Sequence, residues 1–157
     1  MLRSGGCSLT LTAQAPGRHF DGFQPRLAGI APTMPRRAAL VLDICRTDRT
    51  FELADRPDRR GGTQRVWWGK CIHCNGRLVV GLDGRTSKRV TIEHIVPRTH
   101  GGTDDLDNVA LACARCNGAK GRRLDLRPAQ DPDLQAMITR LKRRRAERWR
   151  APDDAPM

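Results

Sequence analysis

The chain has 157 residues, enough for one domain with tails. Only 4% of the residues are aromatic, and this low content argues against a large hydrophobic core and for a small core reinforced by a metal. Lys and Arg number 29 against 17 Asp and Glu, a formal net charge of +12, so nucleic acid is the first candidate partner. The competing interpretation is an arginine-rich surface that is merely solvated. No stretch approaches the roughly 18 apolar residues that span a bilayer and no convincing signal peptide is present, so the reducing cytoplasm is the expected compartment.

The segments before the two adjacent tryptophans are a tail, an apolar run and a charged loop. Residues 1–35 are rich in Gly, Pro, Ser and Thr, and we expect them to form a disordered tail. Residues 36–54 contain a compact apolar run that fits a short helix or a buried strand, because periodicity does not separate the two at this length. Residues 55–65 are charged and contain a Gly-Gly pair, which predicts a loop. Either Met1 or Met34 could be the initiating residue.

Trp67 and Trp68 lie on a predicted strand just before the first cysteine pair. Their side chains leave opposite faces of that strand. At least one tryptophan is expected to pack on the core, and the other is a candidate to stack on a nucleic-acid base or to lie along a groove.

The middle of the chain carries two short β-prone runs, 78–80 and 88–92, with an Asp-Gly turn signal between them, which predicts a hairpin. Gly101-Gly102 then predicts a flexible loop. Residues 114–120 are expected to be helical, with the following glycine ending the helix. The predicted order is therefore strand, strand, long loop, helix.

A second helix is predicted near the C-terminus. Asp131-Pro132-Asp133 is typical of a helix start, and apolar residues recur at helical spacing from there to about Arg150. The arginines at its end either complement the helix dipole or follow nucleic-acid phosphates, and both interpretations stay open. We assign residues 126–150 to this basic helix and 151–157 to a tail.

Four of the six cysteines form two Cys-x-x-Cys pairs, Cys71 with Cys74 and Cys113 with Cys116. One such pair alone would fit a redox dithiol, whereas two pairs around one segment favour tetrahedral zinc. A site closed by four thiolates has no open position, so the zinc is expected to be structural. His73, inside the first pair, would be a ligand only in place of one of the cysteines.

Between and just after the cysteine pairs lie Glu93-His94, Asn108 and Asn117. Phosphodiester hydrolysis needs an activated water and neutralisation of charge on the phosphate. An imidazole can take a proton from water, and carboxylate and amide oxygens suit a hard cation such as Mg²⁺. Taken singly, each of these residues is more often a surface or turn residue. Their spacing within the cysteine frame is what points to chemistry.

Residues 71–120 resemble the zinc-containing HNH endonucleases of the four-cysteine type. The resemblance rests on both cysteine pairs, Glu93-His94-Ile-Val-Pro, Gly101-Gly102, Asn108, and the Asn and Lys that follow the last cysteine. It implies a small α+β fold, the ββα-metal module, in which a two-stranded hairpin, a loop and a helix surround one catalytic cation.

The resemblance also implies roles for individual residues. His94 corresponds to the general base, and Asn108 to the residue that fixes the loop and orients the base. Glu93 and Asn117 correspond to the ligands of the catalytic cation, and the amide at Asn117 favours Mg²⁺ over Zn²⁺. Basic residues at the end of the helix are expected to contact phosphate: Lys120, Arg122 and Arg123.

We therefore expect an HNH nuclease domain over residues 36–125, with its core motif at 71–120. The main hypothesis is a metal-dependent DNA endonuclease or nickase whose products carry a 5′ phosphate and a 3′ hydroxyl, with RNA as a further possible substrate. The alternatives are a non-catalytic zinc-dependent nucleic-acid-binding module and a zinc ribbon that binds protein. A double-strand cut by a protein with one active site would favour a homodimer.

Overall fold

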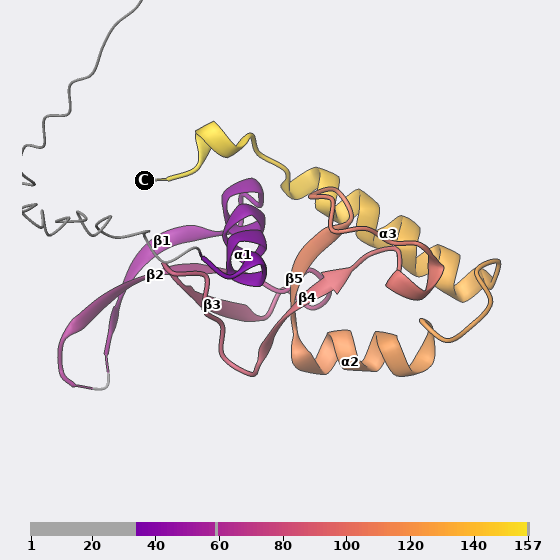
Figure 1. Cartoon of the computed structure of the whole chain (residues 1–157), viewed down its shortest axis with the longest axis horizontal. Coiled ribbons are helices and arrows are strands. Elements are labelled where there is room, and N and C mark those ends of the chain that lie inside the picture. The colour runs from indigo at the N-terminus through magenta and orange to yellow at the C-terminus, as the bar shows by residue number, and fades with distance from the viewer. Residues whose placement is uncertain (1–33, 59, 157) are drawn as a thin grey trace, which may run out of the picture. The chain divides into compact units, whose positions relative to one another are not determined.

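The computed structural model describes residues 34–58 and 60–156, so the predicted tail lies outside the described residues except for its last two positions. The described part has the predicted α+β class (Figure 1). Its helices are α1 (Arg36–Thr47), α2 (Ala114–Arg123) and α3 (Pro132–Arg148), with 3-10 turns η1 (Arg98–His100) and η2 (Pro152–Asp154). One antiparallel sheet contains β1 (Glu52–Pro57), β2 (Thr63–Lys70) and β3 (Arg77–Gly81), and the other contains β4 (Val90–His94) and β5 (Val109–Cys113).

The ββα unit consists of β4, β5 and α2. Val90 lies opposite Cys113 and His94 opposite Val109 in the β4–β5 ladder, and the chain passes from Cys113 directly into α2. The long loop 95–108 joins the two strands of the unit. The predicted order, with both strands before the loop, is therefore wrong, because Val109–Cys113 forms a strand after the loop.

The predicted hairpin of residues 78–80 with 88–92 is also wrong. β3 pairs with β2 along its length, from Val66 opposite Gly81 to Lys70 opposite Arg77. The Asp-Gly turn does form, and Gly84 has a φ of 73°, but an added Cβ there would overlap the carbonyl of Ala38 in α1. The chain therefore turns beneath α1 and enters a different sheet.

The predicted loop over residues 55–65 is mostly a hairpin. β1 and β2 pair from Glu52 opposite Trp68 to Pro57 opposite Thr63. The side chain of Asp58 accepts hydrogen bonds from the backbone N–H groups of Arg60 and Gly62, at 2.8 and 2.7 Å, and so closes the tip. The charged residues of this segment lie at exposed strand positions, which explains why the composition looked like that of a loop.

The apolar run after residue 36 forms a helix. Val41, Ile44 and Cys45 of α1 are buried, and α1 packs against β5. Helix α2 continues past the predicted stop at Gly121 to Arg123, since one glycine inside a helix costs only about 1 kcal/mol. None of the helices among the described residues is long and apolar enough to cross a membrane.

The predicted start of α3 is confirmed. The Asp131 side chain accepts hydrogen bonds from the backbone N–H groups of Asp133 and Leu134, and Pro132 occupies the first turn. The hydrogen bond from Leu134 is the largest cause that lowers the pKa of Asp131. Three apolar residues of α3 are buried in the core: Leu134, Ile138 and Leu141.

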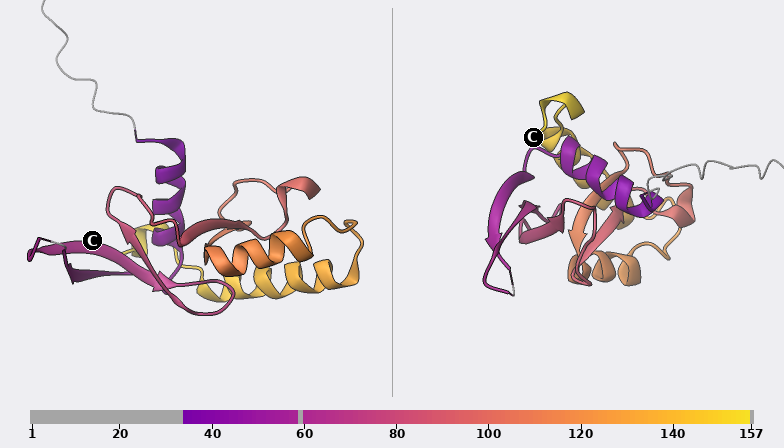
Figure 2. Two further views of the ribbon diagram at one scale, coloured as in Figure 1. Left: turned by 90° about the horizontal axis from the view of Figure 1, so that it is seen from below. Right: turned by 60° about the vertical axis from the view of Figure 1, so that its left-hand side comes forward.

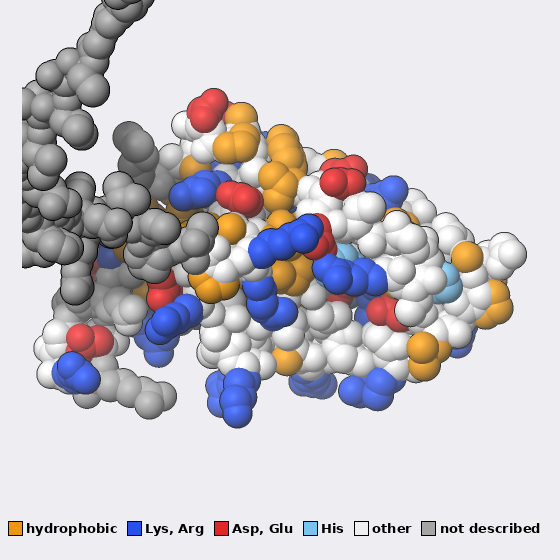
Figure 3. Space-filling model, viewed as in Figure 1, with side chains coloured by type: hydrophobic (Ala, Val, Ile, Leu, Met, Phe, Trp, Pro, Cys, Tyr) orange, Lys and Arg blue, Asp and Glu red, His pale blue; other side chains and the backbone are white. Residues whose placement is uncertain are grey.

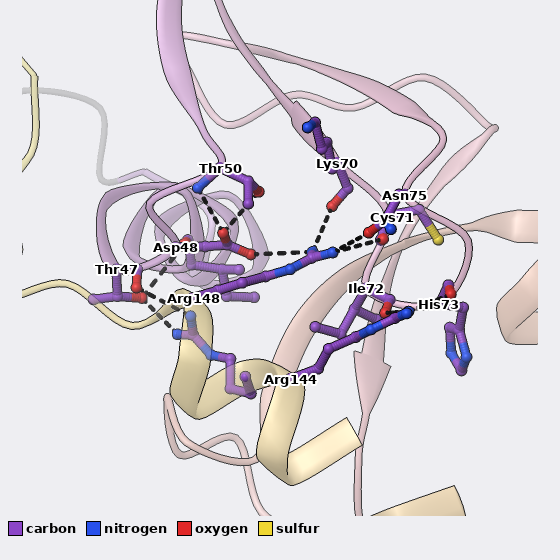
Figure 4. A network of polar contacts seen from close by, with 12 residues as sticks. Thr47, Asp48, Thr50, Lys70, Cys71, Ile72, His73, Asn75, Arg144 and Arg148 are labelled. Carbon is purple, nitrogen blue, oxygen red and sulfur yellow. Dashed lines mark hydrogen bonds and ion pairs between the residues drawn. The ribbon is translucent and has the colours of Figure 1, made fainter. Parts of the chain in front are cut away.

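Arg144 and Arg148, near the end of α3, point into the protein (Figure 4). Arg144 donates to the carbonyls of Ile72 and His73, and Arg148 donates to the carbonyl of Lys70 at 3.1 Å. These carbonyls belong to the end of β2 and the turn around the first cysteine pair. Arg144 and Arg148 therefore hold this turn to α3, a role that neither of the two sequence interpretations of the basic helix end included.

Arg145 and Arg150 tie α3 to the N-terminal helix and the segment after it. Arg145 is 2% exposed and donates to the Thr47 hydroxyl at 2.6 Å and to the Leu106 carbonyl at 2.9 Å. Arg150 donates to the Phe51 carbonyl at 2.7 Å. A buried guanidinium is tolerated only when its donors are paired, so these contacts make α3 an integral part of the fold.

Candidate active site and metal centre

The four paired cysteines form one cluster. The Sγ atoms of Cys71, Cys74, Cys113 and Cys116 all lie within 4.8 Å of one another. Cys71 and Cys74 come from the turn after β2, whereas Cys113 ends β5 and Cys116 lies in the first turn of α2. The backbone N–H of Cys113 points to the Cys71 Sγ at 3.3 Å, as expected around a thiolate ligand. This arrangement fits a closed tetrahedral zinc site.

A bound cation would change the protonation of the cluster. Burial, followed by hydrogen bonds with the Cys113 and Cys74 thiols, raises the pKa of the Cys116 thiol to about 12. Neutral pH would leave such thiols protonated, and a bound metal ion would deprotonate them. The cysteines therefore fit a zinc ion, which would supply folding energy and hold two distant segments together.

Glu93 is fully buried beneath α2 and has cationic or polar partners on both carboxylate oxygens. Its Oε2 lies 2.8 Å from the Nε2 of His73, and its Oε1 lies 2.7 Å from the Nζ of Lys120. Lys120 also lies 3.0 Å from Asp125 Oδ1 and donates to the His94 carbonyl at 2.9 Å. Three oxygens therefore surround the Lys120 ammonium.

This arrangement corrects the prediction that Lys120 contacts phosphate. Lys120 is only 4% exposed, because the charge of the buried Glu93 carboxylate needs a nearby cation. Arg122 and Arg123 remain exposed at the end of α2 and stay candidates for phosphate contact.

Replacing Lys120 with methionine is expected to lower the free energy of unfolding by about 3–5 kcal/mol, because Glu93 would keep a buried charge without its ammonium partner. Urea denaturation of the zinc-loaded protein measures this loss. Arg122→Met removes an exposed cation from the same helix and should change stability by no more than about 0.5 kcal/mol. Equal losses in the two variants would contradict the assignment.

Asn117 lies on the same side of β4 as Glu93. Its Nδ2 donates to the Thr91 hydroxyl at 2.9 Å and to the Ile92 carbonyl at 3.0 Å, and Thr91 and Glu93 share one face of the strand because they are two residues apart. Both hydrogen bonds use the amide nitrogen, which leaves the amide oxygen for an outside ligand. The oxygens of Glu93 and Asn117 suit a hard divalent cation. Such a cation would bind the same Glu93 carboxylate that Lys120 contacts.

His94 leaves the opposite face of β4 from Glu93, since the two residues are consecutive in a strand. Its Nε2 lies 2.8 Å from Asp104 Oδ1 and 3.0 Å from Arg98 Nε. Arg98 also contacts Asp104 at 2.5 Å. The structure thus places the predicted base and the predicted cation ligands on two faces around the end of one strand.

Asp104 and Arg98 fix the orientation of the His94 ring. The hydrogen bond from His94, followed by that from Arg98, lowers the pKa of Asp104, so its carboxylate is ionised at neutral pH and can only accept hydrogen bonds. The Nε2 of His94 faces both this carboxylate and the Nε–H of Arg98, so the two side chains hold the imidazole ring from one side. In the neutral tautomer that carries its proton on Nε2, Nδ1 is the ring nitrogen that accepts a proton from water.

The loop that carries Asp104 is fastened by Asn108. The Asn108 Oδ1 accepts from the Val96 N–H at 2.9 Å, and its Nδ2 donates to the Thr103 carbonyl at 2.9 Å. At Gly102 an added Cβ would overlap the Val96 carbonyl, so the glycine serves a close approach of two backbone segments. Asn108 thereby holds Asp104 against His94.

Comparison with known families decides what this segment is. Residues 71–123 match the family model described as HNH endonuclease. This segment is an HNH domain. The match contains both cysteine pairs and all four polar residues singled out above: Glu93, His94, Asn108 and Asn117. No curated protein and no solved structure gave a match. An HNH domain indicates a nuclease or a nucleic-acid-binding function.

Residues outside the HNH domain complete the pocket at His94. A hollow of about 380 Å³ is lined by His94, Ile92, Arg98 and Asp104 of the domain and by Arg36, Arg37 and Leu40 of α1. Figure 3 shows Lys and Arg side chains gathered on this face of the molecule, over α1 and β4. Sequence reasoning missed Arg36 and Arg37, because nothing in a linear pattern placed the start of α1 beside an HNH strand.

Asp104 and Arg98 were also missed by sequence reasoning. Both lie in the loop between β4 and β5, inside the HNH domain. A signal existed for Asp104, which closely follows the Gly-Gly pair of the motif. A Gly-Gly pair predicts a turn or a loop but not which side chain after it will face a histidine.

Proposed function

We propose that this protein is a metal-dependent DNA endonuclease or nickase in which His94 acts as general base. The observation that carries the proposal is the contact of His94 with ionised Asp104 inside a pocket lined by arginines. A base needs a fixed, unprotonated nitrogen, and a phosphodiester needs cations around it. The HNH domain supplies a histidine held by Asp104, and Arg98 with Arg36 and Arg37 of α1 supplies the cations.

The proposed reaction is hydrolysis of a phosphodiester bond. Water loses its proton to the His94 Nδ1 while Asp104 holds the imidazole through Nε2. Arg36, Arg37 and Arg98 attract the phosphate and oppose its charge. A divalent cation such as Mg²⁺, held by Glu93 and Asn117, would stabilise negative charge on the phosphate and the leaving oxygen. By resemblance to the HNH endonucleases, the products carry a 5′ phosphate and a 3′ hydroxyl.

We place this activity on DNA in the reducing cytoplasm, where a site of four thiolates persists. The direct test is incubation of purified protein with supercoiled plasmid in Mg²⁺, Mn²⁺ or Ni²⁺, with a metal-free control. Cation-dependent conversion to nicked circles supports a nickase, and conversion to linear DNA supports a double-strand cut by a homodimer. Intact plasmid in every metal would contradict the proposal.

A second candidate function is a zinc-dependent nucleic-acid-binding module without catalysis. It is favoured by the engagement of Glu93, whose carboxylate oxygens already contact His73 and Lys120. This alternative predicts binding of DNA or RNA that weakens steeply with salt, with no cleavage in any of the metals. The plasmid assay and a binding assay on the same preparation separate the two functions.

Replacing Asp104 with asparagine is expected to slow DNA cleavage up to about 100-fold, because misplacement of a catalytic group by about 1 Å has effects of this size. Single-turnover nicking at saturating protein measures the step itself. The matched control is Asp107→Asn, which removes the same charge at an exposed position of the same loop. A loss of the same size in both variants would mean that only the net charge of the loop matters.

A further inference from the structure

The tryptophan pair that precedes the HNH domain is divided by β2 between the core and the surface. Trp67 is 6% exposed and belongs to the hydrophobic core, whereas Trp68 is 39% exposed. Alternation along the strand forces this division, because consecutive side chains leave opposite faces. The mechanism proposed at His94 uses neither residue, and Trp68 remains as a large aromatic ring on an open sheet face.

Arg77 partners the Trp68 ring. Its guanidinium lies 4.3 Å from the ring centroid, a cation–π distance. Trp68 pairs across the ladder with Val79, and Arg77 lies opposite Lys70. Figures 1 and 2 show this three-stranded sheet toward the end of the described unit that lies away from α2. Trp68 and Arg77 thus form a fixed pair on β2 and β3, outside the His94 pocket.

Hollows lie on both sides of this pair. One, of about 390 Å³, is lined by Trp68 and Arg77 together with Val66, Val79 and Arg56 among others. The second, of about 600 Å³, is lined by the same two residues together with Lys70, Asn75 and Arg49 among others. Trp68 and Arg77 therefore form a ridge between the two hollows. Each hollow is large enough for small polar groups.

The charges around the ridge favour an anionic ligand. The ionisable side chains that line the two hollows are Arg49, Arg56, Lys70 and Arg77 on the basic side, and Glu52 and Asp55 on the acidic side. Lys70 precedes the first zinc-site cysteine, so the basic edge continues toward the HNH domain. An aromatic ring between cations matches a nucleic-acid strand, whose bases stack and whose phosphates alternate with them.

We propose that Trp68, Arg77 and Lys70 form a binding site for a single strand of nucleic acid, in which an unpaired base stacks on the Trp68 ring. A paired base in a duplex already has both faces covered by its neighbours, so only an unstacked base can use the ring. The inference takes from the proposed function only that the ligand is a nucleic acid, and it does not depend on the cleavage reaction. Trp68 lies outside the segment matched to the HNH family.

The test measures binding and not cleavage. His94→Ala protein loaded with zinc is titrated into a fluorescent oligothymidylate of about 15 nucleotides, near the upper end of known site sizes, and into a duplex of equal length. Adding Trp68→Ala is expected to weaken single-strand binding about 5- to 150-fold, with a much smaller loss on the duplex. Trp68→Phe should keep most of the affinity, because a phenyl ring still stacks.

Trp149→Ala is the matched control, since Trp149 is 37% exposed and also carries an arginine, Arg145, at 4.9 Å from its ring centroid. It lines a different hollow with Asp107 and Lys142, and its removal should leave single-strand affinity unchanged. Equal losses in Trp68→Ala and Trp149→Ala, or no loss in Trp68→Ala, would overturn the inference. Unchanged single-strand affinity of Trp68→Ala would favour a protein partner for this face.

The plasmid assay on the unaltered protein separates this inference from the proposed function. Nicking by the unaltered protein, combined with no effect of Trp68→Ala on binding, would overturn the single-strand site alone. Weaker binding in Trp68→Ala, combined with no nicking in any metal, would overturn the proposed cleavage alone. Circular dichroism and zinc content of Trp68→Ala and Trp68→Phe verify that each variant is folded.

Discussion

Alanine at position 94 is expected to reduce DNA cleavage about 100- to 10,000-fold, the usual contribution of a general base, with little change in stability. The His94 side chain contacts Asp104 and Arg98 at the protein surface, so its removal leaves no buried group unpaired. Cleavage of supercoiled plasmid under single-turnover conditions measures the loss. Zinc content and urea denaturation of the same preparation verify that the HNH domain is intact.

His100→Ala is the matched control for this variant. His100 belongs to the same loop but lies in the η1 turn, and it is absent from the lining of the His94 pocket. Its replacement should leave cleavage within a fewfold of the parent protein. If His94→Ala cleaves as fast as the parent, in a preparation free of other nucleases, then His94 is not the base. Equal losses in both variants would point to a general disturbance of the loop.

Loss of the zinc site is expected to unfold the HNH domain. Structural zinc contributes about 10–16 kcal/mol to the folding of small zinc-binding peptides, whereas a whole domain is stable by about 5–15 kcal/mol. Cys113→Ser should therefore abolish the cooperative unfolding transition and the bound zinc together. Far-ultraviolet circular dichroism and metal analysis after gel filtration measure both.

The position of the cysteines explains why this effect should be large. Cys71 and Cys74 lie in the turn whose His73 contacts Glu93, while Cys113 and Cys116 join β5 to α2. Without the metal, the turn and the ββα unit lose their common anchor, and Glu93 loses a partner. We expect chelation of zinc to abolish cleavage even when Mg²⁺ is abundant.

Cys45 supplies the control for the cysteine substitution. It is fully buried in the core and is not a member of the four-cysteine cluster, and burial raises its pKa far above the ordinary range of a thiol. Cys45→Ala should keep one zinc ion per chain and a cooperative transition. A Cys113→Ser protein with full zinc content and native circular dichroism would exclude the four-cysteine site.

Several features inside and outside the HNH domain could be predicted because their signals are local. The cysteine pairs and the helix start at Asp131 depend on a few neighbouring residues, and the structure contains both. The α+β class was predictable for the same reason, because the cysteine pairs and the polar residues between them form a motif typical of the ββα-metal module. The strand that carries the tryptophans was predicted from its own composition.

The partner of each strand was not predictable in this way. The run 78–80 was expected to pair with 88–92, the next run along the chain, yet β3 pairs with β2 and β4 pairs with β5. Strand pairing depends on which faces can be buried together, and this is settled by the whole set of strands and helices. A turn signal such as that before Gly84 indicates only that the chain reverses locally.

The sequence by itself determined which chemical groups this protein carries: four thiols for a zinc site, a histidine beside a glutamate, two asparagines and an excess of arginine. Only the tertiary structure decided which charged side chains are buried and which partners they contact. Lys120 turned inward to balance Glu93, and Arg145 turned inward to satisfy carbonyls of other segments. Arg36 meanwhile came to lie beside His94. A long cationic side chain follows whichever buried acceptor or carboxylate the fold brings within reach, and that neighbour is distant in sequence.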